Sequence, residues 1–436
     1  MVYKEKTANF LRKANVSVGD LISASKENVN YEGMLLDRSG NSDDEHIVLK
    51  LDNGYNIGVG IDSCEIRLIE KGKPPKIEYS KIDIGKDPNK KDILIASTGG
   101  TVSSIIDYKT GAVHPALSAN DLLKAYPQLL DLANIDVKEI YSILSENMKV
   151  EYWVNIAKSI RSEIESGVDG VVVAHGTDTM HYSSAALSFI LETPVPIVFT
   201  GAQKSSDRPS SDSFINLMNS IGAASSDIAE VTVCMHDTLD DSYCSLHRGT
   251  KVRKMHTSRR DTFRSINNEP LANLKDGHIS SINTNNYIKR NDRELNLRSS
   301  MEPKVAIVKS FPGITDDVIN LYIDNNYKGL LIEGTGLGHL PNCILKTITR
   351  GIEEGMVIAM SSQCIYGRVN MNIYSTGREL LNAGIISCED MTPETAYVKL
   401  SWALGQSENL EEVKNIMATN IVGELNNKTS LKHFLN

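Results

Sequence analysis

The chain has 436 residues, of which 41% are hydrophobic and 23% are charged, and its formal net charge at pH 7 is −9. This length and apolar content allow about three ordinary domains, each with a core of its own. No apolar run approaches the roughly 20 residues that cross a bilayer, and the first residues lack an apolar signal segment, so we expect a cytoplasmic protein without a membrane contact. The negative charge disfavours a protein that binds nucleic acid on its own.

Cysteine and histidine give little sign of a metal centre. The six cysteines are scattered without a CxxC pair, and the ten histidines include no HExxH motif. In a long intracellular chain this distribution favours free thiols, and we expect no metal site.

The first 75 residues differ from the rest of the chain. Short, partly alternating apolar segments separated by turn signals predict a small, SH3-like β-barrel domain over residues 1–75. Residues 71–91 then carry seven lysines and three prolines, which disfavour regular structure and repel one another. We therefore expect a linker over 76–91, more plausibly a solvated connector than an RNA contact.

From Asp92 onward, apolar segments alternate with helical patterns, which is typical of parallel sheets covered by helices on both faces. We expect a larger α/β lobe over 92–290 and a smaller C-terminal α/β lobe over 300–436. The segment 151–166 spaces its large apolar residues by three or four positions, so it is predicted to be a helix. The expected strands are 92–97, 140–144, 169–176, 196–202 and 231–237 in the first lobe and 304–311, 329–336 and 356–363 in the second.

Polar clusters follow four of the expected strands of the larger lobe. They are Thr98-Gly99-Gly100-Thr101, Ser145-Glu146-Asn147-Met148, His175-Gly176-Thr177-Asp178 and Gly201-Ala202-Gln203. Ligands of such sheets bind beyond the carboxyl ends of the strands, so these four loops are expected to line one cleft. The TGGT loop lacks both the GxGxxG pattern and a GK[ST] signature, and we therefore disfavour a phosphate-binding role for it.

Attack by a hydroxyl on a carboxamide fits these clusters better. Such chemistry needs an oxygen nucleophile, a base and donors for the oxyanion. Thr101 follows the glycines, Thr177 stands beside Asp178, and Lys254 lies in a cationic segment whose charge would favour a neutral, basic amine. The alternatives are that Asp178 or Thr179 only caps the following helix and that Lys254 is a solvated surface charge.

Five motifs carry a resemblance to a known family. STGGTVSS, SENM, AHGTDTMHYSSAAL, VFTGAQKSSDRPSSDSFINL and KMHTSRRDTFRSIN resemble, in this order, the motifs of the bacterial-type L-asparaginase family. The resemblance runs from about Asp92 to the end of the chain, and residues 361–400 are similar to the type I branch. It implies a two-lobe asparaginase/glutaminase-like fold with a flavodoxin-like sheet in the larger lobe, and active sites at an intimate dimer interface.

The resemblance also implies residue roles. Thr101 would be the primary nucleophile, and Lys254 and Asp178 would polarise Thr177, with Asp178 also facing the α-amino group of the substrate. Which threonine attacks first stays open, and we favour Thr101. The other expected substrate contacts are Ser145 and Glu146, at the α-carboxylate and amine side, Tyr108 in a mobile lid, and Gly100 and Gly176 beside the threonines.

The N-terminal segment is a departure from plain asparaginases, which begin almost directly at the TGGT strand. The combination of YEGMLLDRS, DEHIVLKLDNGYNIGVGI, linker and asparaginase module resembles the D-subunit family of archaeal glutamyl-tRNA(Gln) amidotransferases. That resemblance implies glutamine as amide donor and delivery of ammonia to an E-subunit, which activates Glu-tRNA(Gln) with ATP and Mg. It further implies a homodimer within a heterotetramer, no cofactor in this chain, and tRNA contacts made mainly by the partner.

Two other functions are considered: a stand-alone cytoplasmic L-asparaginase, and a non-catalytic binding subunit, which the presence of the whole reactive set disfavours. The role of a basic segment is also open, because residues 248–264 hold seven basic side chains against one acidic residue, Asp261. This segment could tune the lysine or dock tRNA or the partner, and we favour a structural and partner role for Arg259 and Arg260. His175, before a tight glycine turn, is expected to be structural and to hydrogen-bond locally.

Overall fold

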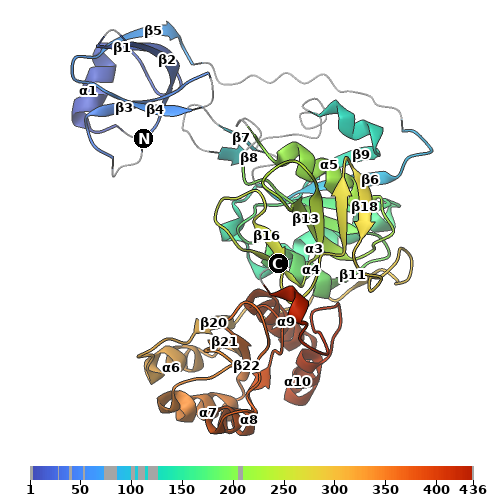
Figure 1. Cartoon of the computed structure of the whole chain (residues 1–436). Helices are drawn as coiled ribbons and strands as arrows, with labels where there is room; N and C mark the ends of the chain where they lie inside the picture. The colour runs from blue at the N-terminus through green and yellow to red at the C-terminus, as the bar shows by residue number, and fades with distance from the viewer. Residues whose placement is uncertain are drawn as a thin grey trace.

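A computed structural model of the chain describes residues 3–27, 29–38, 42–52, 55–72, 86–99, 104–106, 113–115, 126–204 and 210–434. The three largest sheets follow one another along the sequence, and Figure 1 shows them in blue, in light blue through green to yellow, and in orange. Most of the predicted linker over 76–91 lies outside the described residues.

The N-terminal part is a five-stranded antiparallel sheet in the order β4-β3-β2-β1-β5. Ile22 and Ala24 of β1 are fully buried because alternate residues of a strand point to the same side. Helix α1, Glu5–Lys13, adds Leu11 to the same core. The strands are β1 (Leu21–Lys26), β2 (Val29–Leu36), β3 (His46–Lys50), β4 (Asn56–Gly60) and β5 (Glu65–Glu70). The small β-rich N-terminal region expected from the sequence is therefore present.

The larger lobe contains an eight-stranded sheet in the order β18-β17-β14-β13-β12-β10-β6-β9. Neighbouring strands from β13 to β9 in this order are parallel, as expected, whereas the pairings that involve β14, β17 and β18 are antiparallel and were not predicted. The strands are β6 (Asp92–Ser97), β9 (Asn134–Glu139), β10 (Gly170–Ala174), β12 (Ile197–Thr200), β13 (Val231–His236), β14 (Cys244–Arg248), β17 (Ala272–Lys275) and β18 (His278–Ile282).

Helices cover both faces of this sheet. In β6, Leu94 joins the core under helices α3 and α4, while Ile95 joins the core under α5, as the alternation of a doubly covered strand requires. The predicted helix over 151–166 is confirmed as α3. The helices are α3 (Val150–Glu165), α4 (Met180–Ile190) and α5 (Ser213–Ala224), with 3-10 turns η2 (Pro127–Asp131) and η3 (Ser145–Asn147).

The predicted strand over 140–144 is wrong. The strand that pairs with β6 is β9, whose alternating residues suit the end of the sheet, and 140–144 has no strand structure. The backbone N–H groups of Ile140 and Tyr141 both donate to the carbonyl of Ser97, at 2.8 and 3.2 Å, where the chain leaves the ladder. The apolar character of this segment instead reflects packing of Ile140 and Tyr141 against the core under α3 and α4.

The smaller lobe has a four-stranded parallel sheet in the order β20-β21-β22-β23. Its strands, of which the first three were predicted, are β20 (Val305–Lys309), β21 (Gly329–Gly334), β22 (Val357–Ser362) and β23 (Ile386–Ser387). Its helices are α6 (Asp316–Asp324), α7 (Leu345–Glu353), α8 (Ser375–Ala383), α9 (Pro393–Gln406) and α10 (Leu410–Ala418), with 3-10 turns η4 (Asn342–Ile344) and η5 (Leu431–His433).

The two lobes are joined by buried contacts. Helix α9 packs against α4, and its Trp402 belongs to the same core as the α4 residues. Lys251 of the larger lobe forms an ion pair with Asp390 of the smaller lobe at 2.8 Å, and the two side chains are 0% and 2% exposed. Burial lowers the pKa of Lys251, which the attraction of Asp390 opposes. Three further strand pairs are β7 (Ser104–Ile106) with β8 (Val113–Pro115), β11 (Leu191–Glu192) with β19 (Asn296–Leu297), and β15 (Val252–Lys254) with β16 (Phe263–Ser265).

Candidate active site

Three of the predicted residues meet beyond the carboxyl end of β10. Thr177 and Asp178 follow that strand, and Lys254 is the last residue of β15. Nζ of Lys254 donates to Oγ1 of Thr177 at 2.9 Å and to Oδ1 of Asp178 at 2.7 Å. The lysine side chain is only 10% exposed, whereas that of Asp178 is 68% exposed. Lys254 is therefore not a solvated surface charge, and Asp178 offers a carboxylate to anything that enters the site.

This geometry suits activation of the threonine hydroxyl. A base must lie within about 2.6–3.2 Å of the atom whose proton it takes, and the Lys254 amine satisfies that condition toward Thr177. Asp178 orients the amine in turn, so the three side chains place a hydroxyl, an amine and an orienting carboxylate in sequence, as a catalytic triad requires. The arrangement can activate the hydroxyl, or a water beside it, for attack on a carbonyl carbon.

The loop with Ser145 and Glu146 lies against the turn over residues 175–179, which carries Thr177 and which we call the threonine turn. Oγ1 of Thr179 donates to the carbonyl of Ser145 at 2.7 Å, and no side chain caps the start of α4. The capping alternative is therefore wrong for Thr179, because its hydroxyl joins two loops of the site instead. A Cβ on Gly176 would lie 2.7 Å from Cβ of Ser145, so only glycine allows this approach. Ser145 is buried and Glu146 is exposed.

The opening TGGT loop is described as far as Gly99. Thr98 is buried, and its hydroxyl donates to the carbonyl of Ala174 at 3.0 Å, so this threonine is already engaged. Gly99 has φ +109°, and a Cβ there would lie 2.2 Å from the carbonyl oxygen of Ile143. Gly100, Thr101 and Tyr108 lie outside the described residues, so their roles stay predictions.

Two buried histidines stand behind the threonine turn. Nδ1 of His175 lies 2.7 Å from the carbonyl oxygen of Gly176, which confirms the expected local hydrogen bond. Burial lowers the pKa of His175 to about 4, and burial with the nearby Arg253 and Lys254 lowers the pKa of His181 to about 3. Both rings are therefore neutral at pH 7.

A buried carboxylate of the smaller lobe also reaches this region, although no motif in the sequence pointed to it. Glu394, near the start of α9, pairs with Arg253 at 3.0 Å and is only 6% exposed. Burial raises the pKa of Glu394, and the charge of Arg253 opposes that rise. Since Arg253 directly precedes Lys254, this pair ties the lysine strand to the smaller lobe. Arg253 and Glu394 are far apart in the chain, and the local sequence around either residue does not predict the ion pair.

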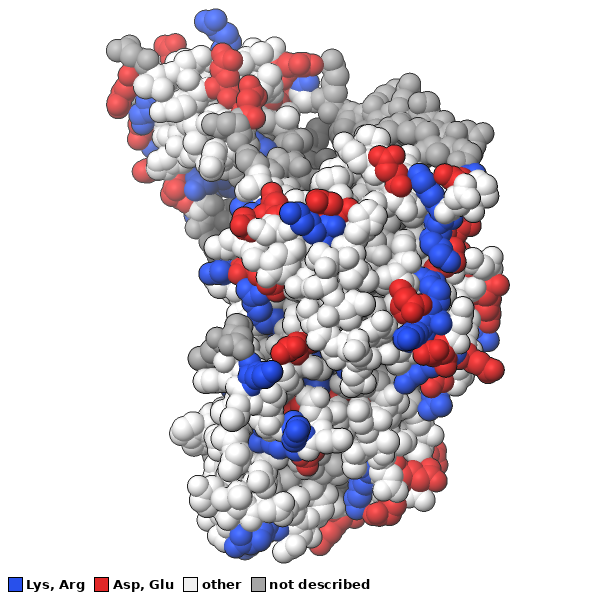
Figure 2. Space-filling view, turned by 45° about the vertical axis from the view of Figure 1, so that its right-hand side comes forward, with Lys and Arg blue, Asp and Glu red and all other residues white. Residues whose placement is uncertain are grey.

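The basic side chains of the segment over 248–264 are paired with carboxylates within the chain. Each of its seven basic side chains has a carboxylate partner within 3.1 Å. The pairs are Arg248–Glu230, Lys251–Asp390, Arg253–Glu394, Lys254–Asp178, Arg259–Asp261, Arg260–Asp241 and Arg264–Asp237. Figure 2 shows basic and acidic side chains interspersed over the face in view.

The part of the chain that the structure describes contains neither a metal-binding cluster nor a membrane-spanning helix. Within those residues, no group of three or more His, Cys, Asp or Glu side chains is placed to hold a metal ion. No helix among them is long and apolar enough to cross a membrane.

Comparison with known proteins agrees with this fold. Residues 92–287 match the model "Asparaginase, N-terminal", and residues 304–417 match "Glutaminase/Asparaginase C-terminal domain". The solved L-asparaginase of Thermococcus kodakarensis is 30% identical, with a TM-score of 0.69, and the match covers 77% of this chain and 100% of that one. L-asparaginase I of Vibrio cholerae is also 30% identical, with a TM-score of 0.66, over 77% of this chain and 99% of that one. The fold is thus that of an asparaginase-type amidohydrolase.

The N-terminal part narrows the assignment. Residues 16–69 match the model "GatD N-terminal domain". The D-subunit of glutamyl-tRNA(Gln) amidotransferase from Methanobrevibacter smithii is 60% identical, and that from Methanothermobacter thermautotrophicus is 57% identical, each over 100% of both chains. The corresponding protein of Pyrococcus abyssi is 50% identical over 98% of this chain and 99% of its own length. The chain belongs to the D-subunit family of glutamyl-tRNA(Gln) amidotransferases.

Proposed function

We propose that this chain is the glutamine-hydrolysing subunit of a tRNA-dependent amidotransferase and that it supplies the ammonia that converts Glu-tRNA(Gln) to Gln-tRNA(Gln). The observation that carries this proposal is the contact of Lys254 with both Thr177 and Asp178, in a chain whose full-length relatives are named as amidotransferase D-subunits. A cytoplasmic location is part of the proposal.

In the proposed reaction, a threonine hydroxyl attacks the carboxamide carbon of glutamine, and its proton passes to a base. The C–N bond then breaks, the proton leaves with the nitrogen as ammonia, and a glutamyl ester of the threonine remains. Water hydrolyses this ester and releases glutamate. We assign the first attack to Thr101, from its place in the TGGT motif. Lys254 would activate the hydroxyl of Thr177, which is the second hydroxyl of the site, or a water beside it.

Substrate recognition is proposed to use the groups around the threonine turn. The exposed Asp178 carboxylate suits the α-ammonium group of glutamine, since only one of its oxygens contacts Lys254. Ser145 and Glu146 lie on the loop held against that turn and would bind the α-carboxylate and amine side. Tyr108, Gly100 and Gly176 complete the proposed contacts, of which only Gly176 is among the described residues.

The partner is proposed to be an amidotransferase E-subunit, which would bind ATP and Mg and hold most of Glu-tRNA(Gln). Two observations support this division. The relatives are named as subunits of one enzyme, and the basic segment of this chain is internally paired, which leaves little free charge for phosphates. We further propose a homodimer through the asparaginase module, with no cofactor in this chain. The domain limits at 75, 91, 290 and 300 belong to the same proposal.

The alternative of a stand-alone L-asparaginase is favoured by one observation, the similarity to solved L-asparaginases. Reconstitution separates the two functions. The chain is combined with a candidate E-subunit, ATP, Mg and Glu-tRNA(Gln), and formation of Gln-tRNA is measured with glutamine or asparagine as donor. We expect glutamine-dependent product only when both proteins are present. Efficient asparagine hydrolysis by the chain alone, with no product in the reconstituted mixture, would reject the proposal.

A further inference from the structure

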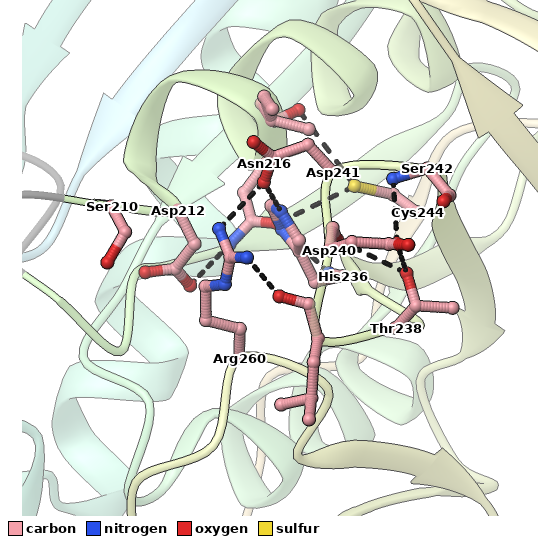
Figure 3. A network of polar contacts seen from close by, with 12 residues as sticks. Ser210, Asp212, Asn216, His236, Thr238, Asp240, Asp241, Ser242, Cys244 and Arg260 are labelled. Atoms are coloured by element: carbon pink, nitrogen blue, oxygen red, sulfur yellow. Dashed lines mark hydrogen bonds and ion pairs between the residues drawn. The ribbon is translucent and has the colours of Figure 1, made fainter.

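A buried polar network lies beside the candidate site, and Figure 3 shows it from close by. It consists of Asp212, Asn216, His236, Asp241 and Arg260, which we call the His236 network. Asp212, Asn216 and His236 are fully buried, while Asp241 is 57% exposed and Arg260 is 13% exposed. The network therefore runs from the interior of the larger lobe to its surface, although the chemistry proposed above uses none of its members.

One end of the network holds the loop that follows β12. Nδ2 of Asn216 donates to the carbonyl of Gly201 at 2.9 Å. The carboxylate of Asp212 accepts the backbone N–H groups of Gln203, at 3.0 and 3.1 Å, and of Lys204, at 2.9 Å. These contacts fix the course of the chain from 201 to 204.

That loop packs directly on the candidate catalytic threonine. A Cβ added to Gly201 would lie 2.9 Å from Cγ2 of Thr177, 2.6 Å from the carbonyl oxygen of His175 and 2.7 Å from Cε of Met180. The backbone of Gly201 thus packs directly against the side chain of Thr177. A shift of this loop would move the threonine or open space beside it.

The other end of the network holds the hairpin that carries Lys254. Arg260 lies in the loop between β15 and β16, and its Nη1 donates to Oδ1 of Asp241 at 2.7 Å. Its Nη2 also donates to the carbonyl of Leu239. A guanidinium bound at two points fixes both position and direction, which a single contact does not. The hairpin loop is therefore fastened to the segment after β13.

His236 connects these two ends, and its ring is bound on both sides. The amide of Asn216 has a fixed orientation because Nδ2 donates to Gly201 and to Oδ2 of Asp212, at 3.0 Å. Nδ1 of His236 lies 2.6 Å from Oδ1 of Asn216, and Nε2 lies 3.2 Å from Oδ1 of Asp241. Both neighbours are acceptors, so both ring nitrogens carry a hydrogen and the ring is a cation.

The charges around the ring agree with that state. The titratable and charged groups that face it are Asp241, Asp212 and Cys244, with Arg260 beyond Asp241. Burial lowers the pKa of His236, but the contacts with Cys244 and Asp241 and the charge of Asp212 outweigh burial and raise the net pKa.

We propose that the His236 network positions Lys254 against Thr177 by linking the lysine hairpin to the loop behind the threonine. Its members are positioning residues, because none contacts the reacting atoms. The direct contact between the lysine and threonine closes a ring with the network, so both groups are held from two sides. The inference rests on the proposed function, in which Thr177 and Lys254 act on glutamine. Correct orientation of catalytic groups has a large effect on the reaction rate, since misplacing such a group by about 1 Å can lower the rate roughly 100-fold.

The test compares two neighbouring arginines of the same loop in the reconstituted enzyme. Arg260→Ala cuts the link to Asp241, whereas Arg259→Ala removes a half-exposed side chain whose one ion pair within the described part of the chain is with Asp261. We expect Arg260→Ala to lower kcat for glutamine hydrolysis by about tenfold or more, with KM changed by less than about twofold. Arg259→Ala should leave both constants near the wild-type values, and Arg260→Lys should recover part of the lost kcat because it keeps one charged contact.

Equal kcat for Arg260→Ala and Arg259→Ala would overturn the inference. Lys254→Met serves as the reference: if it retains full activity, the proposed site fails, whereas its inactivity together with unaffected Arg260 variants rejects the network alone. Should Arg260→Ala not fold, Asp241→Asn tests the same step, because Asp241 contacts both Arg260 and His236. A wild-type kcat for a folded Asp241→Asn would also reject the positioning role.

Discussion

Acidification should destabilise the larger lobe through His175, and the size of the effect follows from its environment. Burial lowers the folded-state pKa of His175 to about 4, whereas an ordinary histidine has a pKa of 6.5. Between these values the unfolded chain binds a proton that the folded chain does not, so stability falls as the pH falls. From pH 7 to pH 5 the loss is about 2 kcal/mol for this single ring, as linkage requires.

The perturbation that isolates this effect is His175→Asn, measured by urea unfolding at several pH values between 7 and 5. The asparagine amide can replace Nδ1 as the group beside the carbonyl of Gly176, but it does not titrate. The stability advantage of wild type over the variant should therefore shrink by about 2 kcal/mol over that range. A constant difference between wild type and His175→Asn over this pH range would refute the neutral, buried state.

Two other changes test the packing of the site and the joint between the lobes. Gly201→Ala should lower glutamine hydrolysis by about tenfold or more, because its Cβ would lie 2.9 Å from Cγ2 of Thr177. An unchanged rate would show that the loop behind the threonine can yield. Asp390→Ala should cost about 3–5 kcal/mol in urea unfolding, because it leaves Lys251 buried and unpaired. Asp324→Ala, at an exposed ion pair, should cost less than about 1 kcal/mol; equal losses for the two variants would contradict the assigned burial.

Much of the fold could be predicted because its strands are buried on both faces. Residues 93–96 and 171–174 are apolar throughout, which is how a covered parallel strand appears in a sequence. The end strand β9 alternates polar and apolar residues, so its sequence is less apolar than that of 140–144 beside it, where the strand was predicted. The antiparallel strands β14, β17 and β18 were missed, although Asp276-Gly277 between β17 and β18 is a local signal of a tight hairpin and could have indicated that pair.

The site could be predicted only in part. Thr177, Asp178 and Lys254 were predicted as a group because strand-end motifs and family resemblance point to the same residues, and the structure brings the three side chains into contact. Glu394 and His236 were missed, because a buried partner is defined by the folded chain and not by its neighbours in sequence. The sequence of the segment over 248–264 likewise suggested free positive charge, because most of its carboxylate partners lie elsewhere in the chain.

The ion pairs of the segment over 248–264 also distinguish the role of Arg259 from that of Arg260. Counted along the sequence, the two residues look equivalent. In the structure Arg260 is 13% exposed and is bound to Asp241, whereas Arg259 is 48% exposed and is bound, among the described residues, only to Asp261. A structural role for Arg260 therefore has direct support, and the pair provides a matched comparison for the positioning network.

Ammonium rescue is the most direct test of the proposal that this chain supplies ammonia through Lys254. Formation of Gln-tRNA by the reconstituted enzyme is measured for wild type and Lys254→Met, with glutamine or with ammonium chloride as the nitrogen source. We predict that Lys254→Met lowers the glutamine-dependent rate by about 100-fold or more, as expected for loss of a general base, while the ammonium-dependent rate stays near that of wild type. A wild-type rate with glutamine, or equal loss with both nitrogen sources, would contradict the proposed role of Lys254.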